Sequence, residues 1–180
     1  MVFNFAEEVF TSAGYGITSM LFNIVITGII NLIFTFIAIR TVDSVGRKKL
    51  MLIGSGGLAL TYILLGSCYF LGWKGLPILI TIVVAIAIYA MSLALVTWVV
   101  LSEIFPNNIR GSAMAIATTS LWVASALLVI TFPYLHRLMK VFGTFWVYSI
   151  ICIAGFLLIF FRLPETKGKS LEELEKLLQA

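Results

Sequence analysis

Six residues in three short clusters have the types and positions that could form a charge network. They are Asp43, Gly46 and Arg47, then Glu103 and Arg110, and finally Glu165. Glu103 ends a long apolar stretch, where a carboxylate at the edge of hydrocarbon needs a partner. The fork of an arginine guanidinium can bind a carboxylate through two hydrogen bonds. We therefore predict that Glu103 pairs with Arg47, Arg110 or both, with Glu165 close by. The alternative is that these charges are solvated loop residues.

The rest of the sequence is too apolar for a soluble protein. Of its 180 residues, 61% are hydrophobic and 11% are charged, whereas soluble domains are nearer half and a quarter. So few charges cannot cover a surface in water, which excludes a soluble enzyme and a disordered tail. Nucleic acid is not expected as a partner, because the net charge is only +4 and no basic stretch carries interleaved aromatic residues.

Five stretches of 21 to 31 residues contain no Asp, Glu, Lys or Arg. About 20 apolar residues suffice for one helix to cross about 30 Å of hydrocarbon, and a single span must be helical to satisfy its own backbone. We therefore predict an all-α, polytopic membrane protein with a five-helix transmembrane bundle over residues 16–163. The expected crossings are residues 17–39, 50–71, 76–101, 112–135 and 144–161.

The distribution of cations predicts the orientation. Cytoplasmic loops of membrane proteins are enriched in Lys and Arg. Nine cations fall on one side: Arg40, Arg47, Lys48, Lys49, Arg110, Arg162, Lys167, Lys169 and Lys176. Three fall on the other: Lys74, Arg137 and Lys140. We expect a multi-pass protein of the cell's inner (plasma) membrane, in contact with lipid, with its N-terminus outside and its C-terminus in the cytoplasm.

No residue pattern indicates a cofactor, a metal ion or an enzymatic centre. Cys68 and Cys152 lie inside apolar stretches, which favours packed thiols, and His136 has no partner at ligand spacing. The glycine-rich residues 54–57 lack the lysine of a phosphate-binding loop and instead predict a close contact between helices. A membrane-embedded enzyme would also need a polar cluster that this sequence lacks.

Three motifs together resemble the sugar porters of the major facilitator superfamily. They are Asp-Ser-Val-Gly-Arg-Lys at 43–48, Ser-Glu-Ile-Phe-Pro at 102–106 followed by Arg110-Gly111, and Pro-Glu-Thr-Lys-Gly at 164–168. The resemblance covers the whole chain and is greatest to the bacterial D-xylose–proton symporters. It implies helices eight to twelve of a twelve-helix fold, with residues 1–15 as the outer end of a truncated helix seven. Residues 164–180 would form a cytoplasmic tail with a short amphipathic helix.

The resemblance also implies where a sugar would bind and which residues form the conformational charge network. Trp98 would be an aromatic platform for the sugar, although a tryptophan near a membrane interface is often only an anchor. Trp122, Asn31 and Phe5 would also contact sugar, and the alternative for Asn31 is a bond between helices. The six charge-cluster residues would brace the outward-facing state of the transporter.

Two positions depart from the family pattern. Leu121 stands where the xylose symporters have glutamine, so a hydroxyl partner is missing from the implied site. Ala94 and Leu95 replace a Gly-Pro pair. Because Gly and Pro loosen a helix, we expect the third crossing to lack the family's bend.

The implied function is that of the C-terminal half of a monosaccharide transporter, for xylose or glucose, which works by alternating access. Its partner would be the missing N-terminal six-helix half, without which we expect no transport. Proton symport is implied, but the apolar spans contain no deep acid, so facilitated diffusion stays open. The alternative is an inert membrane fragment or scaffold.

Overall fold

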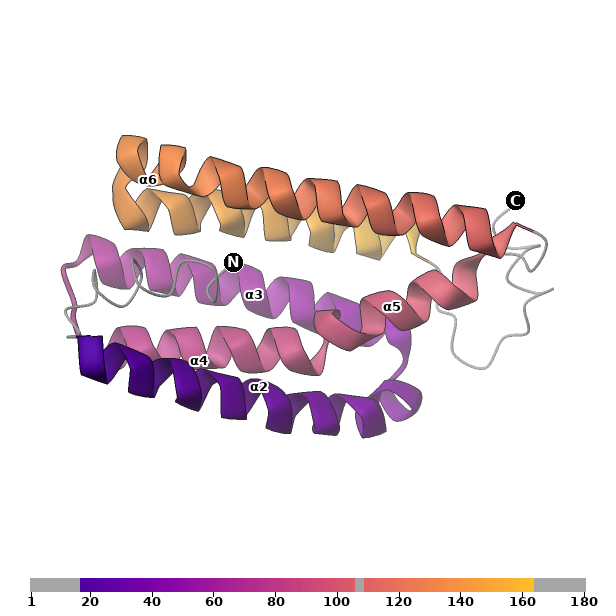
Figure 1. The fold of residues 1–180 in the computed structure, drawn as a ribbon, viewed down its shortest axis with the longest axis horizontal. Coiled ribbons are helices and arrows are strands. Elements are labelled where there is room, and N and C mark those ends of the chain that lie inside the picture. Colours follow the sequence, from indigo (N-terminus) through magenta and orange to yellow (C-terminus); the bar gives the residue numbers. More distant parts are fainter. Residues whose placement is uncertain (1–16, 106–108, 164–180) are drawn as a thin grey trace.

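A computed structural model describes residues 17–105 and 109–163, and every regular element in these ranges is a helix (Figure 1). The helices are α2 (Ile17–Val45), α3 (Arg47–Phe70), α4 (Leu76–Met91), α5 (Leu93–Ile104) and α6 (Arg110–Arg162). The expected helix-seven end at residues 1–15 and the tail at 164–180 lie outside the described residues. The predicted all-α membrane architecture is confirmed.

Four helical segments are long and apolar enough to cross a membrane, with α4 and α5 counted together as Leu76–Ile104. The last segment, α6, has 53 residues and would be about 80 Å long if straight. It is not straight: Lys140 has φ 58° and ψ −176°, and the chain folds back on itself there (Figure 1). The two arms of α6 therefore account for the fourth and fifth crossings.

The third crossing is broken at Ser92, so the expectation of a straight helix was wrong. Ser92 has φ −121° and ψ −80° and separates α4 from α5. It is fully buried, and its hydroxyl donates to the carbonyl of Ile88 at 2.5 Å. Gly54 of α3 packs so closely that a Cβ there would lie 2.7 Å from Cβ of Ser92. The break therefore coincides with close packing against α3. The identities of Ala94 and Leu95 alone do not reveal this break.

Helix α3 lies in the middle of the bundle, with α4 on one side and α6 on the other (Figure 1). Its glycines at 54–57 face close neighbours, as the sequence predicts: a Cβ at Gly57 would lie 3.1 Å from Ile88 of α4. The largest core cluster joins α3, α4 and the second arm of α6 through Leu65, Ile82 and Phe145. A second cluster, which includes Val42, Leu50, Val96 and Val100, lies at the end of the bundle that carries Arg47.

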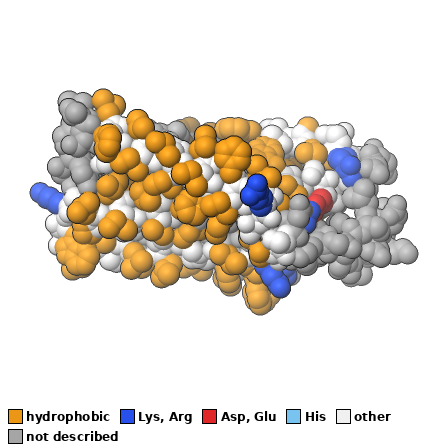
Figure 2. Space-filling view, turned by 90° about the horizontal axis from the view of Figure 1, so that it is seen from below, with side chains coloured by type: hydrophobic (Ala, Val, Ile, Leu, Met, Phe, Trp, Pro, Cys, Tyr) orange, Lys and Arg blue, Asp and Glu red, His pale blue; other side chains and the backbone are white. Residues whose placement is uncertain are grey.

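The outer surface is apolar along most of its length. Figure 2 shows the face over α2 covered by hydrophobic side chains, with most of its Lys and Arg residues toward one end. Helix α2 contributes exposed Phe22, Ile29, Leu32 and Phe36 to the surface. Such a surface suits lipid or another apolar helix rather than water.

Candidate charge pair and groove

The charge pair at one end of the bundle joins two helices that are far apart in sequence. Nη2 of Arg47, the first residue of α3, lies 3.0 Å from Oε1 of Glu103 in the last turn of α5. Both side chains are partly buried, with 16% and 27% exposed. Gly46 has φ 102°, which an L side chain rarely adopts, and this turn brings α3 directly after α2. The structure thus contains the predicted pairing of Glu103 with Arg47.

Arg110 makes a different contact from the predicted one. Its Nε donates to the backbone carbonyl of Phe105 at 3.2 Å, which links the start of α6 to the end of α5. Among the described residues, the ion pair of Glu103 is with Arg47. Asp43 lies in the last turn of α2, but its side chain and all of Glu165 lie outside the described part of the chain.

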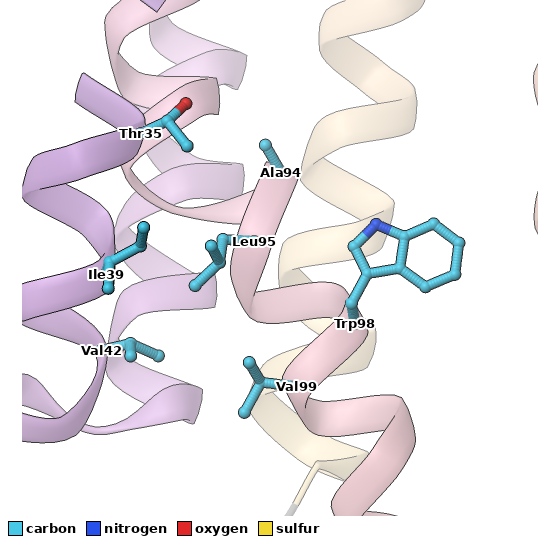
Figure 3. Close-up of a pocket in the computed structure, with 7 residues that line it drawn as sticks. All are labelled: Thr35, Ile39, Val42, Ala94, Leu95, Trp98 and Val99. Atoms are coloured by element: carbon cyan, nitrogen blue, oxygen red, sulfur yellow. The ribbon is translucent and has the colours of Figure 1, made fainter. Parts of the chain in front are cut away.

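Two adjoining cavities follow α2 toward the same end. The first holds about 530 Å³ between α2 and α5 (Figure 3). Its walls are Thr35, Ile39, Val42, Ala94, Leu95, Trp98 and Val99. The second, of about 430 Å³, is lined by Gly28, Asn31, Leu32, Thr35, Phe36 and Ile39 of α2. Thr35 and Ile39 line both cavities, so the two cavities adjoin, and together we name them the α2–α5 groove.

The structure brings the predicted sugar-binding residues only partly together. Asn31 lines one cavity of the groove and Trp98 lines the other. Trp98 is 42% exposed, and its indole points away from the α2 side chains (Figure 3). Trp122, on the first arm of α6, is 63% exposed and lines neither cavity. Phe5 lies outside the described residues.

Thr35 is the groove residue that the sequence reasoning missed. It is the polar residue common to both cavities, and it lies one turn after Asn31 on α2. The available signal was spacing, because Asn31 and Thr35 continue a run of polar residues at every fourth position from Asn23.

The groove has the chemistry of a site for a neutral solute. Among the described residues that line its two cavities, Thr35, Asn31 and Trp98 carry polar groups and none carries a charge. Uncharged donors and acceptors among apolar walls suit a ligand with both hydroxyl groups and apolar faces. Secondary transporters bind their solutes at sites between membrane-spanning helices, and the position of this groove fits that class of protein.

The comparisons with known proteins agree with this class. The family model of sugar (and other) transporters matches residues 1–178, and the chain belongs to this family. It is 40% identical over 183 residues to the D-xylose-proton symporter of Escherichia coli (strain K12), covering 98% of this chain and 37% of that protein. It is also 40% identical over 174 residues to the arabinose-proton symporter of Bacillus subtilis (strain 168), covering 96% and 38%.

A solved structure shows the same arrangement of helices. The major facilitator superfamily proton:xylose symporter XylE, bound to 6-bromo-6-deoxy-D-glucose, superposes with a TM-score of 0.88 at 40% identity. The match covers 98% of this chain and 38% of that one. The predicted resemblance to sugar porters is therefore confirmed, and the chain spans about 37–38% of the length of the relatives it matches.

Proposed function

We propose that this chain forms the C-terminal half of a monosaccharide transporter that works by alternating access. The observation that supports this most directly is the α2–α5 groove, whose described lining residues carry no charge, in a chain of the sugar transporter family. Relatives include symporters for D-xylose and arabinose, so we propose a xylose- or glucose-type sugar as substrate. Asn31, Trp98, Trp122 and Phe5 would contact it.

The partner in this proposal is an N-terminal half of six helices. Substrate sites of such transporters lie between two halves, and the described walls of the groove come from α2 and α5. A wall on one side cannot exclude water or alternate between two openings. We therefore propose that the chain does not transport sugar by itself. The competing proposal, an inert membrane fragment or scaffold, predicts no sugar binding in any combination.

Proton coupling would depend on the other half. In the described residues, the carboxylates are Asp43 and Glu103, and both lie near helix ends rather than midway along a crossing. A group that carries a proton across the membrane has to lie in the path between its two sides. The described part of this chain would therefore supply sugar contacts and the charge network of Arg47 and Glu103, and no proton carrier.

We also propose that the end of the bundle with Arg47 faces the cytoplasm, as does the C-terminus, in the plasma membrane. Arg40, Lys49 and Arg162 lie toward this end, whereas Lys74 lies toward the other. A membrane-impermeant thiol reagent tests this with single cysteines at positions 49 and 74, after replacement of Cys68 and Cys152. Each cysteine should react from a different side. Reaction of both from one side would contradict the orientation.

Uptake of labelled xylose and glucose into proteoliposomes tests the transport proposal. The chain alone should give no saturable uptake, and the chain with a matching N-terminal half should give uptake that Trp98→Ala abolishes. Saturable, Trp98-dependent uptake by the chain alone would contradict the need for a partner. Absence of both uptake and sugar binding in every combination would favour the inert scaffold.

A further inference from the structure

Four polar residues recur at every fourth position of α2, a helix that is otherwise strongly apolar. They are Asn23, Thr27, Asn31 and Thr35. Successive members are about 6 Å apart along the helix axis and about 40° apart around it. The row therefore turns slowly around the helix. Its first two members are buried, with 5% and 2% exposed, whereas Asn31 and Thr35 emerge in the α2–α5 groove.

The hydrogen bonds of this row determine what it can offer to a ligand. The hydroxyl of Thr35 donates to the backbone carbonyl of Asn31 at 2.7 Å. Its proton is therefore used inside the helix, and its lone pairs remain as acceptors. The side-chain amide of Asn31, which can donate and accept, has no hydrogen-bond partner among the described residues. The groove thus presents an amide and, one turn away, a hydroxyl that acts as an acceptor.

We propose that Thr35 is a second sugar-contacting residue of α2, which accepts a hydrogen bond from one sugar hydroxyl while the amide of Asn31 binds another. This inference rests on the proposed function. One helical turn is comparable with the width of a pyranose ring, so a single sugar can reach both groups. Leu121 brings no polar group from α6, which leaves more of the hydroxyl recognition to α2.

A role in helix packing does not account for Thr35. Its hydrogen bond stays within α2, so it links no second helix, and its side chain lies at the junction of two cavities. Thr27, by contrast, is 2% exposed and donates to Ile24 within the same helix. The two threonines have similar local bonds, but only Thr35 is open to a ligand in the groove.

The test measures sugar binding to the full chain in lipid nanodiscs. Saturation-transfer NMR detects the binding of D-xylose and of its single-deoxy analogues. Thr35→Val keeps the shape and removes the hydroxyl, and Thr35→Ser restores it. Thr41→Val is the control, because its hydroxyl donates to Ile37 within the same helix at 2.8 Å but lies outside the groove. Thermal unfolding of each variant, followed by circular dichroism, reports on structural damage.

Thr35→Val should weaken xylose binding by about three- to tenfold, the usual effect of one neutral hydrogen bond. Thr35→Ser should stay within about twofold of the unmodified chain, and Thr41→Val should have no effect. One deoxy analogue should bind equally to the unmodified chain and to Thr35→Val, because the hydroxyl that Thr35 accepts from is already absent.

Three results would overturn the inference, and they are distinguishable from each other. Unchanged xylose binding in Thr35→Val would exclude the contact while the proposed function stands. A loss that is equal for xylose and all deoxy analogues, together with a lower unfolding temperature, would assign Thr35 a structural role. Absence of sugar binding by the unmodified chain, both alone and together with a matching N-terminal half, would contradict the proposed function and this inference together.

Discussion

Helices α2 and α3 are both apolar enough to cross a membrane, yet they are used in opposite ways. The more apolar one is the more exposed: α2 has a mean hydropathy of 2.3 with 17% of its most apolar window buried, against 1.7 and 44% for α3. In lipid, apolar surface alone does not drive helices together, whereas small residues permit close packing. Hydropathy therefore identifies the crossings, and the position of small and polar residues determines which helix lies inside.

The largest expected effect comes from adding a methyl group to an enclosed glycine of α3. A Cβ at Gly66 would lie 2.5 Å from Cδ1 of Trp146 and 3.0 Å from the backbone oxygen of Phe142. Overpacking of this kind costs about 1–3 kcal/mol, and the backbone contact places Gly66→Ala at about 2–3 kcal/mol. The measurement is SDS-induced unfolding in mixed micelles, followed by far-UV circular dichroism.

The control for that variant is Gly28→Ala on α2, where an added Cβ meets nothing within 4 Å. Its free energy of unfolding should stay level or rise by up to about 1 kcal/mol, because alanine favours a helix over glycine. Equal destabilisation by the two variants would contradict the contrast between an enclosed α3 and an open α2.

The next effect concerns the charge pair that links α3 to α5. Arg47→Gln should lower the free energy of unfolding by about 1–2 kcal/mol, between the values for exposed and for buried pairs. Arg40→Gln is the control on α2, because Arg40 is exposed at the same end; it should change stability by less than about 0.5 kcal/mol. A double-mutant cycle of Arg47→Gln with Glu103→Gln that shows no coupling would contradict the pair.

One residue of α2, Asn23, is buried like the inner residues of α3, so its substitution should change the free energy of unfolding. Asn23 is 5% exposed, and its Nδ2 has no hydrogen-bond partner in the described part of the chain. An unpaired buried amide is costly, so Asn23→Leu should raise the free energy of unfolding by about 1 kcal/mol. Asn31→Leu, in the open groove, should bring no such gain. Destabilisation by Asn23→Leu would reveal a partner for this amide.

The smallest effect distinguishes hydrogen bonds between helices from those within one. The hydroxyl of Ser149 on α6 donates to the carbonyl of Ala59 on α3 at 2.9 Å, in a buried position. Ser149→Ala should lower stability by about 0.6 kcal/mol, the average for such bonds in membrane proteins. Thr27→Val, whose hydroxyl bonds only within α2, should have almost no effect. An equal loss in both would show that the bond between helices adds nothing.

The sequence predicts those parts of the structure that depend on local composition. Charge-free stretches identify the crossings because lipid excludes charge, and Arg137 and Lys140 mark the turn that divides α6. The prediction that Glu103 pairs with Arg47, Arg110 or both followed from chemistry alone. The choice of Arg47 over Arg110 did not, since both guanidinium groups had the right type, and only the tertiary arrangement places one of them 3.0 Å away.

Other features depend on contacts between distant segments. The break at Ser92 lies against Gly54 of α3, a contact that residues 90–95 by themselves do not reveal. The groove is formed where α5 diverges from α2, and Thr35 gains its importance only from lying in both cavities. For the same reason, the sequence predicted that Asn31 and Trp98 belong to one sugar site, but it did not reveal that they line two adjoining cavities.

The break at Ser92 makes α5 a separate rod of 12 residues that carries both Trp98 and Glu103. The two residues are about 7.5 Å apart along one helix, so any change in its tilt acts on both. A ligand that prefers one position of α5 must alter the stability of the Arg47–Glu103 pair by the same coupling free energy with which that pair alters the ligand's affinity. For such a ligand, this reciprocity links the middle of α5 at Trp98 to its end at Glu103, so mutation of the ion pair changes the affinity for the ligand.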